Sequence, residues 1–206
     1  MAVRLNRFER KARTRGELIA AARRVFMLRG FHGASLDEIA EEAGYTKGAV
    51  YSNFADKDAL YLAVLDAHYA GRLEAFEGIM LGGESVGATY LAVSRFMAEA
   101  DAREPDWLPL LAEFVAHAAR HESVRSAYLQ TRERFLEAIA GMLETSCERH
   151  GVALRVSYLD AARASSLLAR GLSAERRLDP DAVSPELFVE LHTALMHGLT
   201  VPAREE

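Results

Sequence analysis

The five prolines of this 206-residue chain all stand at position 105 or later. Because proline breaks the interior of a helix, the front half of the chain can form long, uninterrupted helices. Alanine occurs 36 times against 17 for valine and isoleucine together, and no segment bounded by turn residues alternates apolar and polar side chains. Composition and the spacing of apolar residues therefore predict an all-α fold.

Capping residues and glycines divide the chain into about nine predicted helices. Residues 14–17 have the form of a capping box, and the first helix runs from there to residue 30. Ser35 opens a second, short helix that ends in a glycine turn, and Thr46 opens a third that ends near Phe54. The remaining helices are predicted at residues 57–80, 85–102, 107–120, 123–149, 157–176 and 185–199.

The two short helices around Gly44 have the proportions of a helix-turn-helix, whose second helix enters the major groove of DNA. Ser35 and Thr46 place hydroxyl groups at predicted helix N-termini, where the helix dipole favours phosphate oxygens. Lys47 starts the second helix as a cation, and Gly48 lets the backbone approach the bases. We therefore expect this segment to read double-stranded DNA.

The residues on either side of this motif agree with that prediction. Tyr51, Asn53 and Lys57 carry donors suited to the phosphates that flank the groove. The first 24 residues hold eight Lys or Arg against two Glu, although the whole chain has a net charge of −5. Arg13 and Arg15 belong to this basic arm, which we expect to contact the DNA backbone. Each residue alone also has an ordinary explanation, as a helix cap, a surface cation or a core aromatic.

From about Arg13 to Leu60 the chain resembles the tetracycline-repressor (TetR) family of bacterial transcriptional regulators, through residues 21–26, 35–40, 43–48 and 51–54. The resemblance implies an all-α homodimer with a DNA-binding domain at residues 1–56. It also implies a larger domain at residues 57–206 that dimerises and binds a small effector. The positions that match DNA contacts of the family are Ser35, Thr46, Lys47, Gly48, Tyr51 and Lys57.

Two residues depart from the pattern of the family. Asn53 stands where histidine is frequent, and Tyr45 replaces a small aliphatic residue. The expected function is a repressor that a small-molecule effector releases from a palindromic operator. A transcriptional activator and an effector-independent repressor are alternatives, and an all-α enzyme or scaffold that retained a helix-turn-helix is an alternative from a different class.

Dimerisation is expected because one helix-turn-helix reads only one half-site. The last two predicted helices carry apolar stripes, and together with their copies they would form a four-helix interface, as the resemblance also implies. These stripes can equally belong to the core of one chain. The predicted interface residues are Ala161, Ser165, Leu168, Leu172, Leu187, Phe188, Leu191 and Leu195.

The middle helices, at residues 57–149, mix aromatic and polar side chains in the manner of a ligand cavity. Aromatics at helical spacing also form ordinary cores, which is the competing interpretation. Glu113, His117 and His121 share a predicted helix face, but a solvated edge or a pocket wall is favoured over a metal site. The predicted effector-pocket residues are His68, Tyr69, Phe76, Tyr90, Phe96, Trp107, Phe114, His117, His121, Tyr128 and Arg132.

No motif typical of an enzyme occurs in the chain: there is no His-Glu-x-x-His, no phosphate-binding glycine loop after a strand and no Gly-x-Ser-x-Gly. We expect no catalytic residue, metal or cofactor. Cys147 is the one cysteine, which allows no disulfide within the chain and suits a reducing cytoplasm. The apolar runs are far shorter than the ~20 residues that span a bilayer, so no membrane partner is expected.

Overall fold

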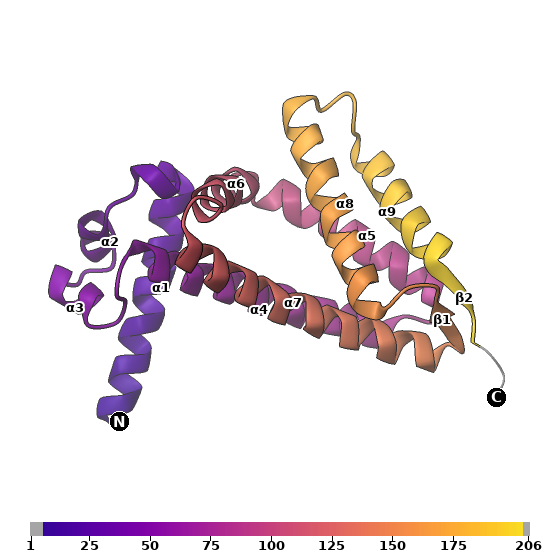
Figure 1. Cartoon of the computed structure of the whole chain (residues 1–206), viewed down its shortest axis with the longest axis horizontal. Coiled ribbons are helices and arrows are strands. Elements are labelled where there is room, and N and C mark those ends of the chain that lie inside the picture. Colours follow the sequence, from indigo (N-terminus) through magenta and orange to yellow (C-terminus); the bar gives the residue numbers. More distant parts are fainter. Residues whose placement is uncertain (1–5, 204–206) are drawn as a thin grey trace, which may run out of the picture. The chain divides into compact units, whose positions relative to one another are not determined.

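The computed structural model describes residues 6–203, so the first five residues of the predicted DNA-binding domain lie outside the described residues. The described part of the chain forms nine α-helices, which confirms the all-α prediction. Figure 1 labels them as α1 (Arg7–Gly33), α2 (Leu36–Glu42), α3 (Lys47–Tyr51), α4 (Lys57–Gly82), α5 (Val86–Arg103), α6 (Trp107–Ala118), α7 (Glu122–Arg149), α8 (Tyr158–Leu178) and α9 (Pro185–Leu199).

The predicted start of the first helix is wrong. Asn6 caps α1, because its side-chain oxygen accepts from the Glu9 N–H at 2.9 Å while the Glu9 carboxylate accepts from the Asn6 N–H at 2.7 Å. The first buried residue of α1 is Leu18, so the turns before it have no apolar stripe to reveal them in the sequence. The predicted break at Gly30 is confirmed, since its φ of 74° is not helical.

The other predicted caps are confirmed. Ser35, Thr46, Ser157 and Ser184 each accept from the backbone N–H three residues later, and Asp56 accepts from the Ala59 N–H at 2.7 Å. The predicted helix ends are less accurate: α3 stops at Tyr51 rather than near residue 54, and α1, α4, α6 and α8 end within two or three residues of the predicted positions. Local side-chain chemistry therefore sets most of the helix starts.

Two short strands were not predicted. β1 (Val152–Leu154) pairs antiparallel with β2 (Thr200–Pro202), with Ala153 opposite Val201. Each strand is only three residues long, which is too short to show an alternating pattern in the sequence. The pairing joins the chain after α7 to the chain after α9.

The chain forms two compact units, and the first contains residues up to Tyr69 together with Pro109–Thr131. Its core is an aromatic cluster in which the Tyr61 ring stacks on Phe114 with centroids 4.0 Å apart. Phe26 and Phe31 meet the Tyr61 ring edge-on, each at 5.5 Å. The beginning of α4 and α6 thus pack against α1, in the unit that also contains the helix-turn-helix, while the functional division at residues 56 and 57 stays a prediction.

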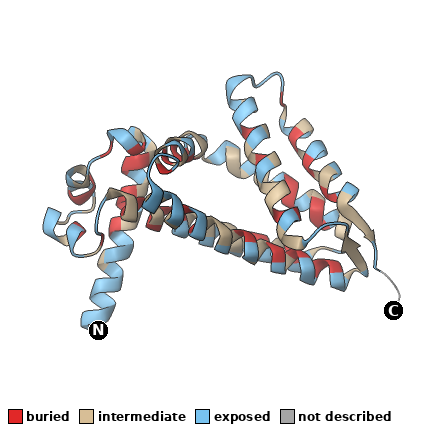
Figure 2. Cartoon of the chain, viewed as in Figure 1, coloured by how far each residue is buried: buried red, intermediate tan, exposed pale blue. Residues whose placement is uncertain are grey.

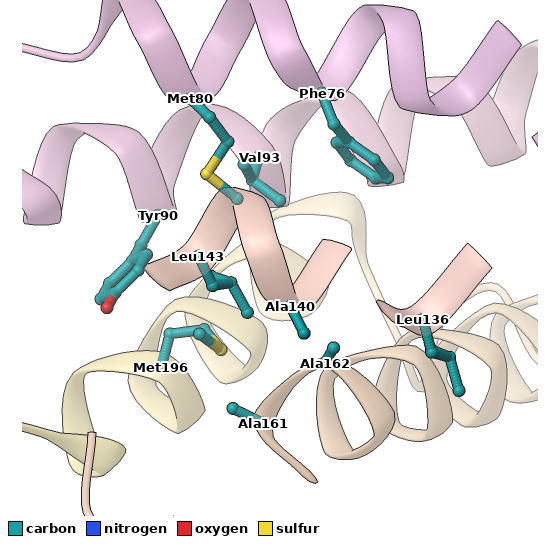
Figure 3. Packing of buried hydrophobic residues seen from close by; sticks show 10 residues of the cluster. All are labelled: Phe76, Met80, Tyr90, Val93, Leu136, Ala140, Leu143, Ala161, Ala162 and Met196. Atoms are coloured by element: carbon teal, nitrogen blue, oxygen red, sulfur yellow. The ribbon is translucent and has the colours of Figure 1, made fainter. Parts of the chain in front are cut away.

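The second unit contains Ala70–Leu108 and the chain from Arg132 onward. In this unit α9 packs against both α5 and α8, as Figure 1 shows. Alanines allow close packing of the helices, because Ala161 and Ala162 of α8 meet Ala140 of α7 in one buried cluster (Figure 3). The other buried members of the cluster are Phe76, Met80, Tyr90, Val93, Leu136, Leu143 and Met196.

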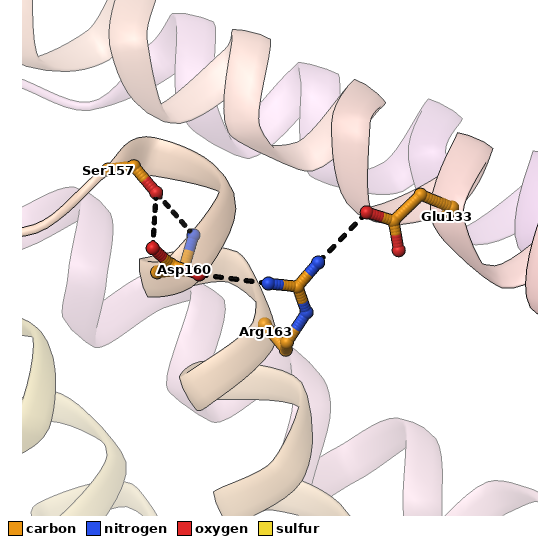
Figure 4. A network of polar contacts seen from close by, with 4 residues as sticks. All are labelled: Glu133, Ser157, Asp160 and Arg163. Atoms are coloured by element: carbon orange, nitrogen blue, oxygen red, sulfur yellow. Dashed lines mark hydrogen bonds and ion pairs between the residues drawn. The ribbon is translucent and has the colours of Figure 1, made fainter.

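Charged side chains tie α7 to α8 at the surface of the second unit. Arg163 binds the Glu133 carboxylate of α7 at 2.9 Å and the Asp160 carboxylate of its own helix at 2.9 Å (Figure 4). Ser157 donates to the other oxygen of Asp160 at 2.7 Å, so the α8 cap and the ion pairs form one network. Among residues 6–203, no helix has the length and apolar character needed to cross a membrane.

Candidate nucleic-acid interface

The helix-turn-helix is built from local capping and one glycine turn. Ser35 and Glu38 form a reciprocal capping box at the start of α2. Gly44 has a φ of 71°, which reverses the chain after α2, and the Tyr45 N–H donates to the Ala40 carbonyl at 2.9 Å. Thr46 then caps α3 by accepting from the Ala49 N–H at 3.3 Å.

The five residues of α3 separate into an anchored side and a free side. Val50 is buried, and Phe54 just after the helix is buried as well, so these two side chains hold the segment to its unit. Lys47, Gly48 and Tyr51 are exposed. Figure 2 colours the whole chain by burial. Tyr51 is 52% exposed, although tyrosines in folded proteins are usually at least partly buried.

Gly48 leaves open space beside the backbone of α3. A Cβ built at Gly48 would meet only the Thr46 hydroxyl, at 3.8 Å. Nothing among the described residues therefore requires glycine there, whereas an external partner that approaches the backbone closely would require it. This agrees with the predicted role of Gly48 in contact with bases.

Lys47 is the cation of the exposed side, and it pairs with Asp37 of α2. Its ammonium nitrogen lies 2.8 Å from the Asp37 carboxylate, and this hydrogen bond raises the pKa of Lys47. Both side chains are more than half exposed, so the pair is weak and open to exchange with another anion. Lys47 therefore stays charged, and its ammonium group can leave Asp37 to bind a DNA phosphate or a base edge.

Arg15 and Asn53 were predicted to contact DNA, and each has a side-chain donor that binds within the protein. The Arg15 guanidinium donates to the Asn53 carbonyl at 2.9 Å and lies over the Phe54 ring, 4.2 Å from its centroid. The Asn53 side-chain amide donates to the Ala49 carbonyl at 2.8 Å and to the Ser52 hydroxyl at 3.3 Å. The sequence could not reveal these contacts, because Arg15 lies 38 positions before its acceptor.

Lys57 also uses its charge inside the unit. Its ammonium group donates to the Ala34 carbonyl at 3.1 Å and to the His32 carbonyl at 3.4 Å. It also lies 4.7 Å from the centroid of the Phe31 ring. The Lys57 side chain thus joins the first turn of α4 to the end of α1 and the link that follows it, and its ammonium group already donates to two carbonyls of the unit. Arg13 by contrast stays exposed on α1, with Glu17 at 3.7 Å.

Tyr45 makes contacts that the sequence did not reveal. Its hydroxyl donates to the Glu17 carboxylate and accepts from the Thr14 hydroxyl at 3.3 Å, so it links the turn before α3 to α1. The one sign of these contacts in the sequence was that Tyr45 stands where the family usually has a small aliphatic residue. Its partners, 28 and 31 positions away, were not visible.

The predicted effector-pocket residues divide between the two units. Those in the first unit are His68, Tyr69, Phe114, His117, His121 and Tyr128, and those in the second are Phe76, Tyr90, Phe96, Trp107 and Arg132. Phe114 has no exposed surface and lies in the aromatic core, so its assignment to a pocket wall is corrected. Phe76 and Tyr90 belong to the buried cluster of Figure 3.

The histidines of α6 and the following turn face polar partners of the same unit. The His117 Nε2 lies 3.0 Å from the Asp58 carboxylate at the start of α4, and its ring lies 4.2 Å from that of His121. The His121 Nδ1 bonds the His117 carbonyl at 2.8 Å. Within residues 6–203, no cluster of three His, Cys, Asp or Glu is arranged to hold a metal ion.

Cys147 is buried in the second unit. Its sulfur lies 3.7 Å from the Tyr90 hydroxyl, which also bonds the Thr200 hydroxyl at 3.1 Å. Burial raises the pKa of the Cys147 thiol, which disfavours the reactive thiolate. This environment is that of a packed thiol.

The predicted dimer residues include two that cannot lie at a surface. Ala161 and Phe188 have no exposed area within the single chain, so their assignment is corrected to the core of the second unit. Ser165 is half-buried and bonds the His192 Nε2 at 2.7 Å. Leu191 is exposed, whereas Leu168, Leu172, Leu187 and Leu195 are half-buried.

A groove of about 1250 Å³ in the second unit was not predicted. It lies between α5, α9 and the end of α8, with Leu91, Ala98 and Val189 among its apolar lining residues. Arg176 and Glu190 are among its charged lining residues. Its walls come from segments about 100 positions apart in the chain, so no local sequence pattern could announce it.

Comparisons with known proteins place the chain among bacterial regulators. The profile of "Bacterial regulatory proteins, tetR family" matches residues 18–64. The transcriptional activator FasR of Mycolicibacterium smegmatis is 51% identical over 63 residues, which are 31% of this chain and 28% of FasR. The chain thus spans less than a third of the length of FasR. TtgW of Pseudomonas putida, an HTH-type transcriptional regulator, is 33% identical over 128 residues, which are 61% of this chain and 91% of TtgW.

The repressor NemR of Escherichia coli is 34% identical over 71 residues, which are 34% of this chain and 36% of NemR. The crystal structure of its reduced form has the same fold, with a TM-score of 0.70 at 23% identity over 93% of this chain and 100% of that chain. The helix-turn-helix geometry, the matched profile and the long match to TtgW agree. This chain belongs to the TetR family of bacterial regulatory proteins.

Proposed function

We propose that this protein is a sequence-specific DNA-binding transcriptional regulator that acts as a homodimer on a palindromic operator. The observation that carries this proposal is the free side of α3, where Lys47, Gly48 and Tyr51 are exposed while Val50 anchors the helix. A short helix with that division presents its side chains to the edges of base pairs. Exposed basic residues of α1, such as Arg13, would neutralise DNA phosphates beside the groove.

Selection from a pool of randomised duplexes tests this function directly. The purified protein should enrich one palindromic sequence whose half-sites lie about one helical turn apart, or a multiple of it. Failure to enrich any duplex at modest ionic strength would contradict the proposal.

Two variants of α3 then identify the reading surface. Lys47→Ala and Tyr51→Phe should each weaken binding to the selected duplex by roughly five- to a hundredfold, because each removes a contact of ~1–3 kcal/mol. Tyr158→Phe is the matched control, since Tyr158 lies on α8 in the second unit. Fluorescence anisotropy gives the affinities, and circular dichroism checks the fold. Wild-type affinity in both α3 variants would place the reading surface elsewhere.

Regulation is proposed to follow from a small effector bound among the middle helices. The helix α4 starts at Lys57 in the first unit and ends in the second, so a shift of α4 would reach the helix-turn-helix through the Lys57 contacts. Repression is the proposed outcome, which agrees with the name of NemR. Activation is the alternative, because FasR is named as an activator.

Reporter transcription separates the two outcomes. A reporter promoter that contains the selected duplex should be less active when the protein is present. Greater activity with the protein present would favour the activator alternative. Neither result depends on knowing the effector.

A further inference from the structure

We infer that Arg15 and Tyr45 are positioning residues that hold the recognition helix α3 to α1 at both of its ends, and that Arg15 is not a phosphate contact. The inference rests on the proposed DNA-binding function and concerns how its reading surface is aimed. Three residues of one short stretch of α1, Thr14, Arg15 and Glu17, carry all of these ties.

The helix α3 needs outside support because it is only five residues long. Helices this short are unstable alone, so their orientation depends on the side chains around them. Val50 is the one buried residue of α3 itself, and the buried Phe54 anchors only the chain behind the helix, so the two leave the front end of α3 without a buried anchor. The aim of Lys47 and Tyr51 therefore depends on contacts at the two ends.

The tie behind the helix is made by Arg15. Its guanidinium donates to the Asn53 carbonyl, which comes two residues after the end of α3, at 2.9 Å. The same group lies 4.2 Å from the centroid of the buried Phe54 ring. A hydrogen bond to a charged donor and a cation–π contact together favour this position over one extended into solvent.

The tie in front of the helix is made by Tyr45. The residue lies directly before the Thr46 cap, and its ring is half-buried. Its hydroxyl donates to the Glu17 carboxylate and accepts from the Thr14 hydroxyl. A small aliphatic residue, which the resemblance leads one to expect here, could pack but could not make either bond.

The two ties together restrain rotation as well as position. The front tie joins α1 to Tyr45, which precedes the Thr46 cap of α3. The rear tie joins α1 to Asn53, which follows the helix. A helix held at both ends keeps its exposed side in one orientation. Losing either tie should let α3 pivot on Val50 and lower the fit to a specific sequence, while phosphate contacts made by other residues continue.

The test compares the salt dependence of binding in Arg15 variants. The probes are a duplex selected by the wild-type protein from a randomised pool and an unselected duplex of the same length. Arg15→Ala should weaken binding to the selected duplex by roughly tenfold and leave binding to the unselected duplex unchanged. The slope of log affinity against log salt concentration should stay at the wild-type value, because no phosphate contact is lost.

Conservative variants separate positioning from charge. Arg15→Lys keeps the positive charge but replaces the planar guanidinium, so it should lose nearly as much affinity for the selected duplex as Arg15→Ala. Tyr45→Phe keeps the ring and removes only the hydroxyl, and it should lower the same affinity with an unchanged salt slope. Arg103→Ala is the matched control, since exposed Arg103 pairs with Glu99 in the second unit.

The possible outcomes distinguish this inference from the proposed function. A slope smaller by ~0.9 in Arg15→Ala, restored by Arg15→Lys, would identify a phosphate contact and overturn the inference alone. Unchanged specific affinity in both Arg15→Ala and Tyr45→Phe would also overturn it. If the wild-type protein selects no duplex, the DNA-binding function fails and the inference fails with it. Thermal unfolding within a few degrees of wild type shows that the variants are folded.

Discussion

At the scale of single residues, His192 shows how burial sets chemistry. The imidazole lies between three helices of the second unit, with its Nδ1 2.8 Å from the Ser94 hydroxyl and its Nε2 2.7 Å from the Ser165 hydroxyl. Ser94 donates its own proton to the Tyr90 carbonyl at 2.8 Å, so it accepts from the histidine, and Nδ1 carries the proton. Burial lowers the pKa of His192 to about 4.

This histidine predicts a loss of stability in acid. Its pKa falls from 6.5 in the unfolded chain to about 4 in the folded one, so the unfolded chain binds more protons between those values. The free energy of unfolding should therefore fall by roughly 2 kcal/mol from this residue between pH 7 and pH 4.5. Urea denaturation at both pH values measures it.

His192→Gln provides the comparison for this prediction. Glutamine can still donate and accept but does not titrate, so the loss between pH 7 and pH 4.5 should be smaller in the variant. The carboxylates and the other histidines titrate equally in both proteins, so their contributions cancel in the difference between the two pH profiles. Parallel pH profiles for the two proteins would contradict the role assigned to His192.

At the scale of secondary-structure elements, capping side chains decide where most helices begin. The Ser35 hydroxyl accepts from the Glu38 N–H at 3.2 Å, and the Glu38 carboxylate accepts from the Ser35 N–H at 3.0 Å. The Ser35 hydroxyl also donates to this carboxylate at 2.9 Å, and this bond, together with the one from the Ser35 N–H, lowers the pKa of Glu38. The helix α2 has only seven residues, so the cap forms a large part of its local support.

Replacing this cap should destabilise the protein in a graded way. Ser35→Ala should lower the free energy of unfolding by ~1 kcal/mol, whereas Ser35→Gly should lower it by only a few tenths. Urea denaturation with an unchanged slope measures both variants. An equal loss in the two variants would show that the hydroxyl acts through something other than the cap.

At the scale of the whole molecule, two exposed leucines mark the surface where a second copy is expected. Leu167 of α8 and Leu191 of α9 are 56% and 41% exposed in the second unit. Exposed apolar side chains on the two helices predicted to dimerise favour association with a matching surface.

A charge at Leu191 should therefore separate the two copies. Leu191→Glu should give a monomer by light scattering at micromolar concentration, because a buried unpaired carboxylate is costly. Leu129→Glu is the control, since Leu129 of α7 is 40% exposed in the first unit and should leave the dimer intact. A dimer that survives Leu191→Glu would move the interface away from α9.

Much of the fold and of the candidate site could be predicted from the sequence, because the signals are local. A capping serine, its acceptor N–H and a glycine turn lie within a few residues, which is why α2, α3 and their caps at Ser35 and Thr46 were predicted correctly. The start of α1 was missed because its front turns carry no apolar stripe, and Leu18 is its first buried residue. The strands were missed because three residues carry no period.

The sequence by itself determined the all-α fold, the helix-turn-helix and the identity of the side chains around α3, since each depends on spacing along the chain. Only the tertiary structure decided what those side chains do. Arg15 and Tyr45 reach acceptors about 30 to 40 positions away, and Lys57 reaches a carbonyl 23 positions back. A cation can donate to a phosphate or to a carbonyl, so its partner is decided by the folded chain that brings the two together.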